Sequence, residues 1–334
     1  MILGQPAFVA EALQRTAAAR GSSFLGRPRR LVLTGCGTSF HAAMYGARVF
    51  QEVMPSVPVR AIHAYDLAYG SSVPANATVI GVSHSGSTPT TNRALHRAHR
   101  RGCRTLAVCG LPSSAMERVA DRTLVIGSTH DRSWANTMSY TTQLTAFAAL
   151  ASQSRSNLGP AIEPSLRGLA RSLETTLGCE SRVRRLATRV AHAARVTFLG
   201  SDLDEITALE AALKIRETSS VPATGYHTEQ FLHGPYLSID DRESIVMLRS
   251  RDDGLRSVAI ARALQASGAT VATVGESARA KIRLPAMPRI LRPILSIVPL
   301  QFLAYYAALA RRANPDIMRT DIPRLRAGVE ALFH

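Results

Sequence analysis

The chain repeats one pattern of a strand, a glycine turn and a helix at an offset of about 165 residues. The first pair of similar segments is RLVLTGCGTSFHAAMYGARVFQ, from Arg30, and RVTFLGSDLDEITALEAALKIRE, from Arg195. The second pair is ATVIGVSHSGSTPTTNRALHRAHRRGCRTLAVCG, from Ala77, and ESIVMLRSRDDGLRSVAIARALQASGATVATVGE, from Glu243. Strands that alternate with helical stretches of about 10 to 15 residues are typical of a parallel sheet with helices on both faces. The repeat therefore predicts an α/β protein with two such domains in tandem.

Length and composition allow two domains. The 334 residues are 46% hydrophobic, which is enough for two buried cores of ordinary size. We place an N-terminal helical segment at 1–25, the first domain at 26–157 and the second at 158–334. The division falls in the polar stretch from Ser152 to Pro164.

The cysteines and the N-terminal stretch indicate a cytoplasmic protein. None of Cys36, Cys103, Cys109 and Cys179 has CxxC spacing or histidines at metal-ligand spacing, so we expect no zinc site, no disulfide framework and no cofactor. The N-terminal sequence MILGQPAFVAEALQRTAAAR has polar residues where a signal peptide needs an unbroken apolar core. We therefore expect no export signal and a reducing compartment.

The most apolar run, Ile294 to Ala310, predicts a buried helix. It contains Pro299, Gln301 and two tyrosines, and it falls short of the roughly 20 apolar residues that a membrane span requires. We therefore expect no membrane contact.

The formal net charge of +16 raises the question of a nucleic-acid partner, because phosphate backbones dominate such affinities. Among the 40 lysine and arginine residues only Lys214 and Lys281 are lysines, and the arginines are scattered along an alanine-rich chain. This pattern indicates a compositional bias toward arginine, and the sequence has no recognisable helix-turn-helix or aromatic-plus-basic module. We expect no nucleic-acid partner and interpret the charge as suited to an anionic small substrate.

The stretch GVSHSGSTPTT, from Gly81 to Thr91, crowds hydroxyl groups at the end of a strand. A loop of glycine, serine and threonine between a parallel strand and a helix directs N–H groups, hydroxyl donors and the positive end of the helix dipole at one point. Such a loop holds a phosphate, although an ordinary turn with a helix cap has the same composition. The paired segment RSRDDG has acidic residues in place of the hydroxyls, so we expect only the first copy to bind phosphate.

Several separated motifs resemble those of tandem sugar isomerase (SIS) domains, in particular the isomerase half of the glucosamine-6-phosphate synthase (glutamine–fructose-6-phosphate transaminase) family. The first SIS domain of that family resembles GCGTSFH, SHSGST and NTMSYTTQLTA, and the second resembles FLGSDLDEITALEAALKIRE, HTEQFLHGPYLSID and IVPLQFLAYYAALARRANPDI. The resemblance covers nearly the whole chain and implies two SIS domains, each a flavodoxin-like three-layer sandwich. We expect the family's glutaminase domain to be missing, because position 2 is not cysteine and a further domain has no room.

The resemblance also implies site residues. Those in the first domain would bind the phosphate and the sugar hydroxyls: Thr38, Ser39, Ser83, His84, Ser85, Thr88 and Asn136, the last standing where the family usually has a serine. Glu217 in ALKIRE matches the base that moves a proton between the first two sugar carbons. His233 in FLHGP matches the histidine that opens the sugar ring and reaches the site from the neighbouring subunit. A homodimer is therefore expected.

Elementary chemistry supports the same catalytic pair. Aldose–ketose interconversion through an enediol needs a carboxylate near the C1 and C2 hydrogens and a group that passes a proton to the ring oxygen. Lys214 lies three residues before Glu217, so both project from one face of a helix, where the lysine keeps the carboxylate ionised or contacts the substrate. The alternatives are a surface salt bridge for this pair and a structural role for His233. Because the chain uses arginine nearly everywhere, a lysine here indicates a need that arginine does not meet.

Residues near these motifs are given structural or peripheral roles. Glu210, one turn before Lys214, is interpreted as a structural partner. We interpret His41 and His227 as core or rim histidines and Trp134 as a rim residue.

The C-terminal sequence departs from the family pattern. The family ends in PRNLAKSV or a close relative, whose lysine forms a Schiff base with the ketose carbonyl, whereas this chain ends in DIPRLRAGVEALFH. Pro323–Arg324 match, but Ala327 and Gly328 occupy the lysine region and no lysine follows Lys281. Arginine stays protonated and is no imine nucleophile. The departure argues against Schiff-base chemistry and leaves enolisation by Glu217 intact.

Three functions are consistent with these residues. The first is an enzyme on a hexose 6-phosphate or amino-hexose 6-phosphate, with ketose–aldose isomerisation as its reaction and amination or deamination through free ammonia as the closest variant. The second is a deglycase that splits the phosphorylated Amadori product of a sugar and an amino acid, whose wider pocket suits the altered sequence at Trp134–Asn136. The third is a non-catalytic sugar-phosphate sensor, which the presence of both Glu217 and His233 disfavours.

Overall fold

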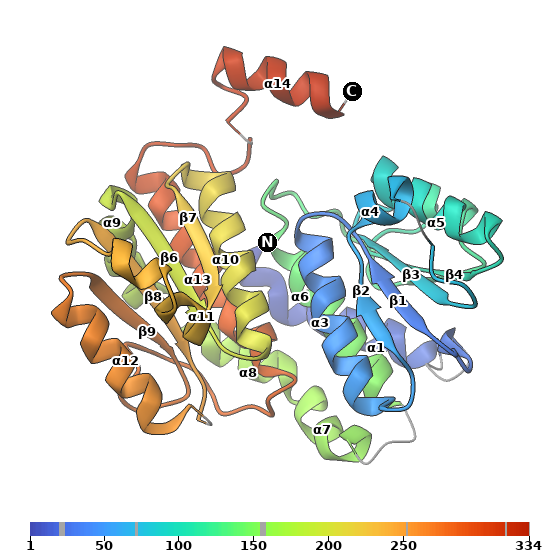
Figure 1. Cartoon of the computed structure of the whole chain (residues 1–334), viewed down its shortest axis with the longest axis horizontal. Coiled ribbons are helices and arrows are strands. Elements are labelled where there is room, and N and C mark those ends of the chain that lie inside the picture. Colours follow the sequence, from blue (N-terminus) through green and yellow to red (C-terminus); the bar gives the residue numbers. More distant parts are fainter. Residues whose placement is uncertain (20–23, 71–72, 154–157, 252, 318, 334) are drawn as a thin grey trace.

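Two parallel sheets, one from each sequence repeat, organise the chain (Figure 1). The computed structural model describes residues 1–19, 24–70, 73–153, 158–251, 253–317 and 319–333. The predicted division at residue 157 lies outside the described residues, so the ranges 1–25, 26–157 and 158–334 stay a prediction.

The first sheet has the strand order β2-β1-β3-β4-β5, and every neighbouring pair is parallel. Its strands are β1 (Leu31–Thr34), β2 (Val59–Ala61), β3 (Thr78–Ser83), β4 (Arg104–Cys109) and β5 (Arg122–Val125). This order is that of flavodoxin-like folds, in which ligands bind where the strand order reverses, at the carboxyl ends of the first and third strands. In this chain those ends are the glycine turn after β1 and the hydroxyl-rich loop after β3.

The second sheet has the order β10-β9-β8-β6-β7, which is the order of the first sheet listed from the opposite edge. Its strands are β6 (Arg195–Gly200), β7 (Ala223–His227), β8 (Glu243–Arg249), β9 (Thr270–Gly275) and β10 (Ile282–Arg283). The neighbouring strands of this sheet are also parallel. The predicted α/β fold class with two tandem domains is therefore confirmed.

Helices cover the sheets and fill the space between them. They are α1 (Gln5–Ala18), α3 (Thr38–Val53), α4 (Ala64–Tyr69), α5 (Pro89–Arg100), α6 (Thr137–Ser152), α7 (Leu158–Arg167), α8 (Leu169–Leu177), α9 (Glu180–His192), α10 (Leu203–Ser219), α11 (Thr228–Leu232), α12 (Gly254–Ala266), α13 (Arg292–Ala310) and α14 (Pro323–Phe333). Single 3-10 turns occur at η1 (Ile2–Gly4), η2 (Ala115–Arg118) and η3 (Pro235–Ser238). In Figure 1, α3, α6, α10 and α13 lie between the two sheets.

Helix α13 is the central helix of the second domain. By length and composition it is apolar enough to cross a membrane, yet 78% of its most apolar window is buried in the protein, where it packs against α9 and α10. Its first residue, Arg292, is also buried, and Nε donates to Asp204 Oδ2 on α10 at 2.8 Å. The predicted buried helix is confirmed.

A glycine at the same position in each repeat lets the helix that follows the strand pack close to it. A Cβ on Gly35, after β1, would lie 2.8 Å from the Ser39 carbonyl oxygen, and a Cβ on Gly200, at the end of β6, would lie 2.1 Å from that of Asp204. Each strand therefore turns sharply into a helix, α3 in the first repeat and α10 in the second. The first turn of α3 and the stretch of α10 from Glu210 to Glu217 carry the charged cluster of the candidate site.

The C-terminal helix α14 stands clear of both sheets in Figure 1. It begins at Pro323 and contains Ala327 and Gly328, the residues in the region of the family's lysine. The structure therefore places this segment apart from the α10 residues.

Candidate active site

Helix α10 carries three charged side chains that meet on one face. The Lys214 Nζ atom lies 2.7 Å from Glu217 Oε2 and 3.2 Å from Glu210 Oε1. The Lys214 side chain is only 1% exposed and the Glu217 side chain 20% exposed, so the alternative of a surface salt bridge is wrong. The predicted juxtaposition of Lys214 and Glu217 is present.

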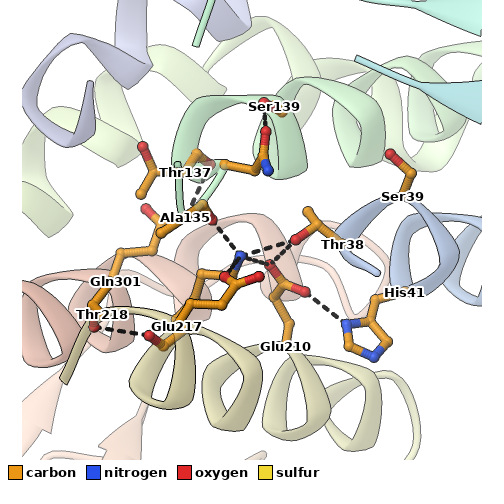
Figure 2. Close-up of polar contacts among 12 residues, drawn as sticks. Thr38, Ser39, His41, Ala135, Thr137, Ser139, Glu210, Glu217, Thr218 and Gln301 are labelled. Carbon is orange, nitrogen blue, oxygen red and sulfur yellow. Dashed lines mark hydrogen bonds and ion pairs between the residues drawn. The ribbon is translucent and has the colours of Figure 1, made fainter. Parts of the chain in front are cut away.

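The first domain completes this cluster (Figure 2). The Thr38 hydroxyl donates to Glu210 Oε1 at 3.0 Å and accepts from Lys214 Nζ at 2.9 Å. His41 Nδ1 lies 2.6 Å from Glu210 Oε2, and the carbonyl oxygen of Ala135 also accepts from Lys214. The buried carboxylate of Glu210 thus has the structural role expected of it.

Burial and charge set the proton affinities of the cluster in opposite directions. Burial raises the pKa of Glu210, but Lys214, His41 and Thr38 outweigh it and hold that pKa below its usual value. Burial lowers the pKa of Lys214, but the two glutamates raise it above its usual value, so the ammonium stays protonated. Burial raises the pKa of Glu217, and the opposing effect of Lys214 does not cancel it. A carboxylate with a raised pKa is suited to act as a general base.

The hydroxyl-rich loop after β3 is ordered by its own hydroxyl groups. Ser83 Oγ lies 3.0 Å from Thr88 Oγ1 and accepts the backbone N–H of Gly86 at 3.1 Å. Ser87 donates to Ser85 Oγ through its backbone N–H and its hydroxyl, at 3.2 and 2.8 Å. Thr88 precedes α5 without a side-chain cap, so the positive end of that helix dipole lies at the loop. The structure thus brings the Ser83 and Thr88 hydroxyls together and pairs Ser85 with Ser87, while phosphate binding by this loop stays a prediction.

The imidazole of His84 does not lie among these hydroxyl groups. Its residue is only 7% exposed, and Nε2 accepts the backbone N–H of Asp131 at 3.2 Å. A Cβ on Gly110 would lie 2.0 Å from His84 Nδ1, which shows how closely the ring packs on that glycine. This contact supports the loop before α6, and a role of His84 in phosphate binding stays a prediction.

The loop before α6 is held by the buried carboxylate of Asp131. This carboxylate accepts from the backbone N–H of Ser133 at 3.2 Å and from the N–H and hydroxyl of Ser139 at 3.0 and 2.7 Å. Asn136 donates to the Trp134 carbonyl at 3.0 Å and accepts from Ser139 Oγ at 3.3 Å. Its amide therefore braces the loop that presents the Ala135 carbonyl to Lys214.

The remaining first-domain prediction, Ser39, lies beside the cluster. Its hydroxyl accepts from Gln143 Nε2 on α6 at 3.1 Å, and Figure 2 shows it pointing away from Glu210. Thr38 and Ser39 thus have different neighbours: Thr38 is engaged by the charged cluster, whereas Ser39 faces α6.

His233 is not brought to Glu217 within one chain. Its side chain is 72% exposed at the end of α11, and Nε2 lies 3.9 Å from Glu229 Oε1. The following Gly234 has a φ of 135°, a conformation that favours glycine, so the backbone turns sharply just after the histidine. Its delivery to a neighbouring subunit stays a prediction.

A cavity of about 460 Å³ adjoins the buried lysine. Ala135, Thr137 and Lys214 line it, and the Thr137 hydroxyl is buried without a hydrogen-bond partner among the described residues. Arg132 and Asp316 also line it. In the part of the chain that the structure describes, no cluster of three histidine, cysteine or acidic side chains could hold a metal ion.

Comparison with known proteins agrees with this architecture. A glutamine–fructose-6-phosphate aminotransferase (isomerizing) of Symbiobacterium thermophilum is 33% identical over 305 residues, and one of Pyrococcus horikoshii is 30% identical over 302. Each match covers 86% of this chain and 50% of the relative, so the chain spans about half the length of these relatives.

Solved structures share the fold. The C-terminal domain of a glucosamine-fructose-6-phosphate aminotransferase of Francisella tularensis superposes with a TM-score of 0.82 at 21% identity, covering 94% of this chain and 96% of that one. A tagatose-6-phosphate ketose/aldose isomerase of Escherichia coli gives 0.80 at 21% identity, covering 95% and 93%. The SIS domain model matches residues 24–153 and 189–311, one match over each sheet. The chain therefore belongs to the SIS domain family, with two SIS domains in tandem.

Proposed function

We propose that this chain is an enzyme that moves a proton between C1 and C2 of a hexose 6-phosphate or amino-hexose 6-phosphate, interconverting ketose and aldose. The observation that carries this proposal is the buried Lys214–Glu217 pair, in which a carboxylate of raised pKa is held by an ammonium at 2.7 Å. Burial of a charged carboxylate costs free energy that its ion pair offsets only in part, so the largely buried position of Glu217 supports a chemical role. The relatives' names, which include aminotransferases and a ketose/aldose isomerase, support the same class of substrate.

Each part of the site has a role in the proposed reaction. The loop of Ser83, Ser85 and Thr88 would hold the phosphate dianion through hydroxyl and backbone donors at the start of α5. Glu217 would then remove a proton from C1 of the open-chain ketose. The electron pair forms the C1–C2 double bond while the C2 oxygen takes up a proton. Return of the proton to C2 and loss of the O1 proton give the aldose.

Lys214 would act by charge and not as a nucleophile. Its ammonium already donates to Glu217, Thr38 and Ala135, and its pKa is raised, so the free amine that an imine requires is not formed. This arrangement favours enolisation over Schiff-base chemistry, with free ammonia as the nitrogen donor in any amination. Ring opening would fall to His233 of a second subunit in a homodimer.

The cavity beside Lys214 favours one second candidate, the Amadori deglycase. Residues of the phosphate loop do not line this cavity, so a substrate on the loop leaves it free for a substituent on C1. The guanidinium of Arg132 and the carboxylate of Asp316, both on its wall, match the carboxylate and amine of an amino acid. In that reaction Glu217 would again take a proton from C1 while the C2 oxygen gains one, and return of a proton to C2 with loss of the N–H proton gives an imine at C1. Water then adds to C1, and the aldose phosphate and the free amino acid are released.

Solvent-isotope exchange separates these functions. The full chain is incubated in heavy water with fructose 6-phosphate, glucosamine 6-phosphate or a fructosyl-amino-acid 6-phosphate, and NMR follows deuterium at C1 and C2. Deuterium in the hexose phosphates supports the isomerase, and release of free amino acid from the third substrate supports the deglycase. Binding of these substrates with neither deuterium exchange nor release of amino acid would support the sensor.

Two variants on α10 assign the exchange to the proposed base. Glu217→Gln keeps the shape of the side chain and removes the base, so exchange should fall at least about 1,000-fold while sugar-phosphate binding persists. Glu205→Gln is the matched control, because Glu205 lies on the same helix and pairs at the surface with Arg48 at 3.8 Å. Exchange at the wild-type rate in Glu217→Gln would refute the assignment.

A further inference from the structure

A hollow lined by positive charges lies on the second domain, on the outer face of α9. Arg182, Arg185 and Arg189 follow one another at spacings of three and four residues, so their side chains share one side of the helix. Leu186 is buried between them, and Lys281, from the segment just before β10, lines the same hollow. The hollow has a volume of about 270 Å³.

The described part of the chain does not neutralise the four cations of this hollow. The residues that line it include no acidic side chain. Among the described residues, no hydrogen bond or ion pair joins the charged groups of Arg182, Arg185, Arg189 or Lys281 to another group. Like charges three or four residues apart destabilise a helix, so the arrangement costs stability unless an anion compensates it.

Other helices of this chain neutralise an arginine with an acidic residue on the same helix. Arg15 on α1 pairs with Glu11 at 2.9 Å, and Arg167 on α7 pairs with Glu163 at 3.0 Å, each with an acid four residues earlier. A compositional excess of arginine explains many exposed arginines, but it does not explain a lysine at the same hollow. Lys281 is one of only two lysines in the chain.

Lys281 gives the hollow a second wall that is independent of α9. Its backbone N–H donates to Thr273 Oγ1 at 3.0 Å, which fixes the turn between β9 and β10. Its ammonium is a compact point charge, whereas the guanidinium groups opposite offer planar pairs of donors. This combination of three guanidinium groups and one ammonium group is suited to binding phosphate oxygens.

We propose that Arg182, Arg185, Arg189 and Lys281 form a second anion site, separate from the Ser83–Thr88 loop, that binds a diphosphate or triphosphate group. The charge decides between phosphate classes. One phosphate monoester dianion would leave about two of the four positive charges uncompensated, whereas a triphosphate balances nearly all of them. The group can belong to a nucleotide or to inorganic oligophosphate.

Calorimetric titration of the full chain with inorganic tripolyphosphate at a fixed ionic strength of about 0.15 M tests the site. The double variant Arg185→Ala/Arg189→Ala should weaken binding about 100-fold or more, because each arginine gives charge-assisted hydrogen bonds. Lys281→Ala should weaken it about 10-fold, since the second wall is lost. Thermal melting checks that these exposed substitutions leave the fold intact. Arg185→Lys/Arg189→Lys, which keeps the charge, should recover part of the affinity.

The matched control is Arg100→Ala/Arg101→Ala at the end of α5. This double variant removes the same charge from a basic helix surface on the first domain. If anions bind only through the general +16 charge of the chain, both double variants should therefore lose the same affinity. Equal losses, or wild-type binding that does not saturate, would overturn the proposal. Titration with ATP and AMP identifies the source of the group. Tighter binding of ATP than of tripolyphosphate indicates a nucleotide, and tighter binding of tripolyphosphate indicates inorganic oligophosphate. AMP should bind most weakly in both cases. AMP binding as tightly as ATP would refute recognition of a polyphosphate group.

Discussion

The ammonium nitrogen of Lys214 lies 2.9 Å from the hydroxyl oxygen of Thr38, so one buried cation bonds the helix α10 of the second domain to the first turn of α3 in the first. The same nitrogen contacts Glu217 and the carbonyl oxygen of Ala135. The geometry of the proposed base therefore depends on the contact between the two domains. Changes at this cation should affect stability and chemistry together.

Replacement of Lys214 by methionine should cost about 3–5 kcal/mol of the free energy of unfolding, because the buried carboxylate of Glu210 loses its ammonium partner and keeps only Thr38 and His41. Urea denaturation followed by circular dichroism measures this loss. The double variant Lys214→Met/Glu210→Gln should recover part of it, since the uncompensated charge is gone. Lys281→Met is the matched control at an exposed lysine and should stay within about 0.5 kcal/mol of wild type. A loss below about 1 kcal/mol for Lys214→Met would contradict this account.

The pH dependence of activity should respond to Glu210. A general base works only when ionised, so kcat/KM should fall as the pH falls through the raised pKa of Glu217. The charge of Glu210 is one of the causes that raise this pKa, so Glu210→Gln should lower it and move the acid limb of the profile to lower pH. Glu205→Gln, at the surface of the same helix, should leave the limb in place. A shift of the limb to higher pH in Glu210→Gln would show that another group titrates there.

The phosphate loop should dominate binding of the ground state. Ser83→Ala and Thr88→Ala each remove a hydroxyl from the proposed dianion site, and each should raise KM for phosphorylated sugars about 10-fold. Steady-state kinetics with phosphorylated and dephosphorylated sugars measures the effect. Ser165→Ala on α7 is a control that removes a hydroxyl outside the loop and outside the cavity beside Lys214. The loop assignment fails if wild type binds dephosphorylated sugars equally well.

The fold and the helix that carries the proposed base are accessible from the sequence because they depend on local patterns. The repeat of strand, glycine and helix predicts both sheets, and the three-residue spacing of Lys214 and Glu217 places both on one face of α10 before any tertiary contact is known. The rarity of lysine was the signal for Lys214, and its burial agrees with that signal.

Contacts across the two domains could not be predicted in this way. His41 reaches Glu210 across 169 residues of sequence, and the Ala135 carbonyl reaches Lys214 across 79, so both contacts follow from domain packing and not from periodicity. A backbone carbonyl also has no signature in the sequence. The motif predicts His84 as a phosphate ligand, but the contact of its buried ring with the backbone of Asp131 has no signature in the sequence.

The proposed homodimer rests on His233, whose side chain is exposed at a sharp backbone turn and is not connected to the α10 cluster of its own chain by any contact of the described residues. If a neighbouring subunit receives this histidine, each site combines Glu217 of one chain with His233 of the other. Glu217→Gln and His233→Ala should then be inactive alone and complement each other after subunit exchange.

The amount of recovered activity follows from the symmetry of the dimer. Random exchange of equal amounts makes about half of the dimers mixed, and each mixed dimer has one intact site of two, so activity should return to about a quarter of wild type. Light scattering establishes the dimer, and differently tagged subunits prove the exchange. Glu205→Gln mixed with His233→Ala is the control. Both kinds of chain carry intact Glu217, and half of the chains carry His233, so activity should be about half of wild type. A mixture of Glu217→Gln and His233→Ala that stays inactive despite proven exchange would mean that His233 serves its own chain or takes no part in catalysis.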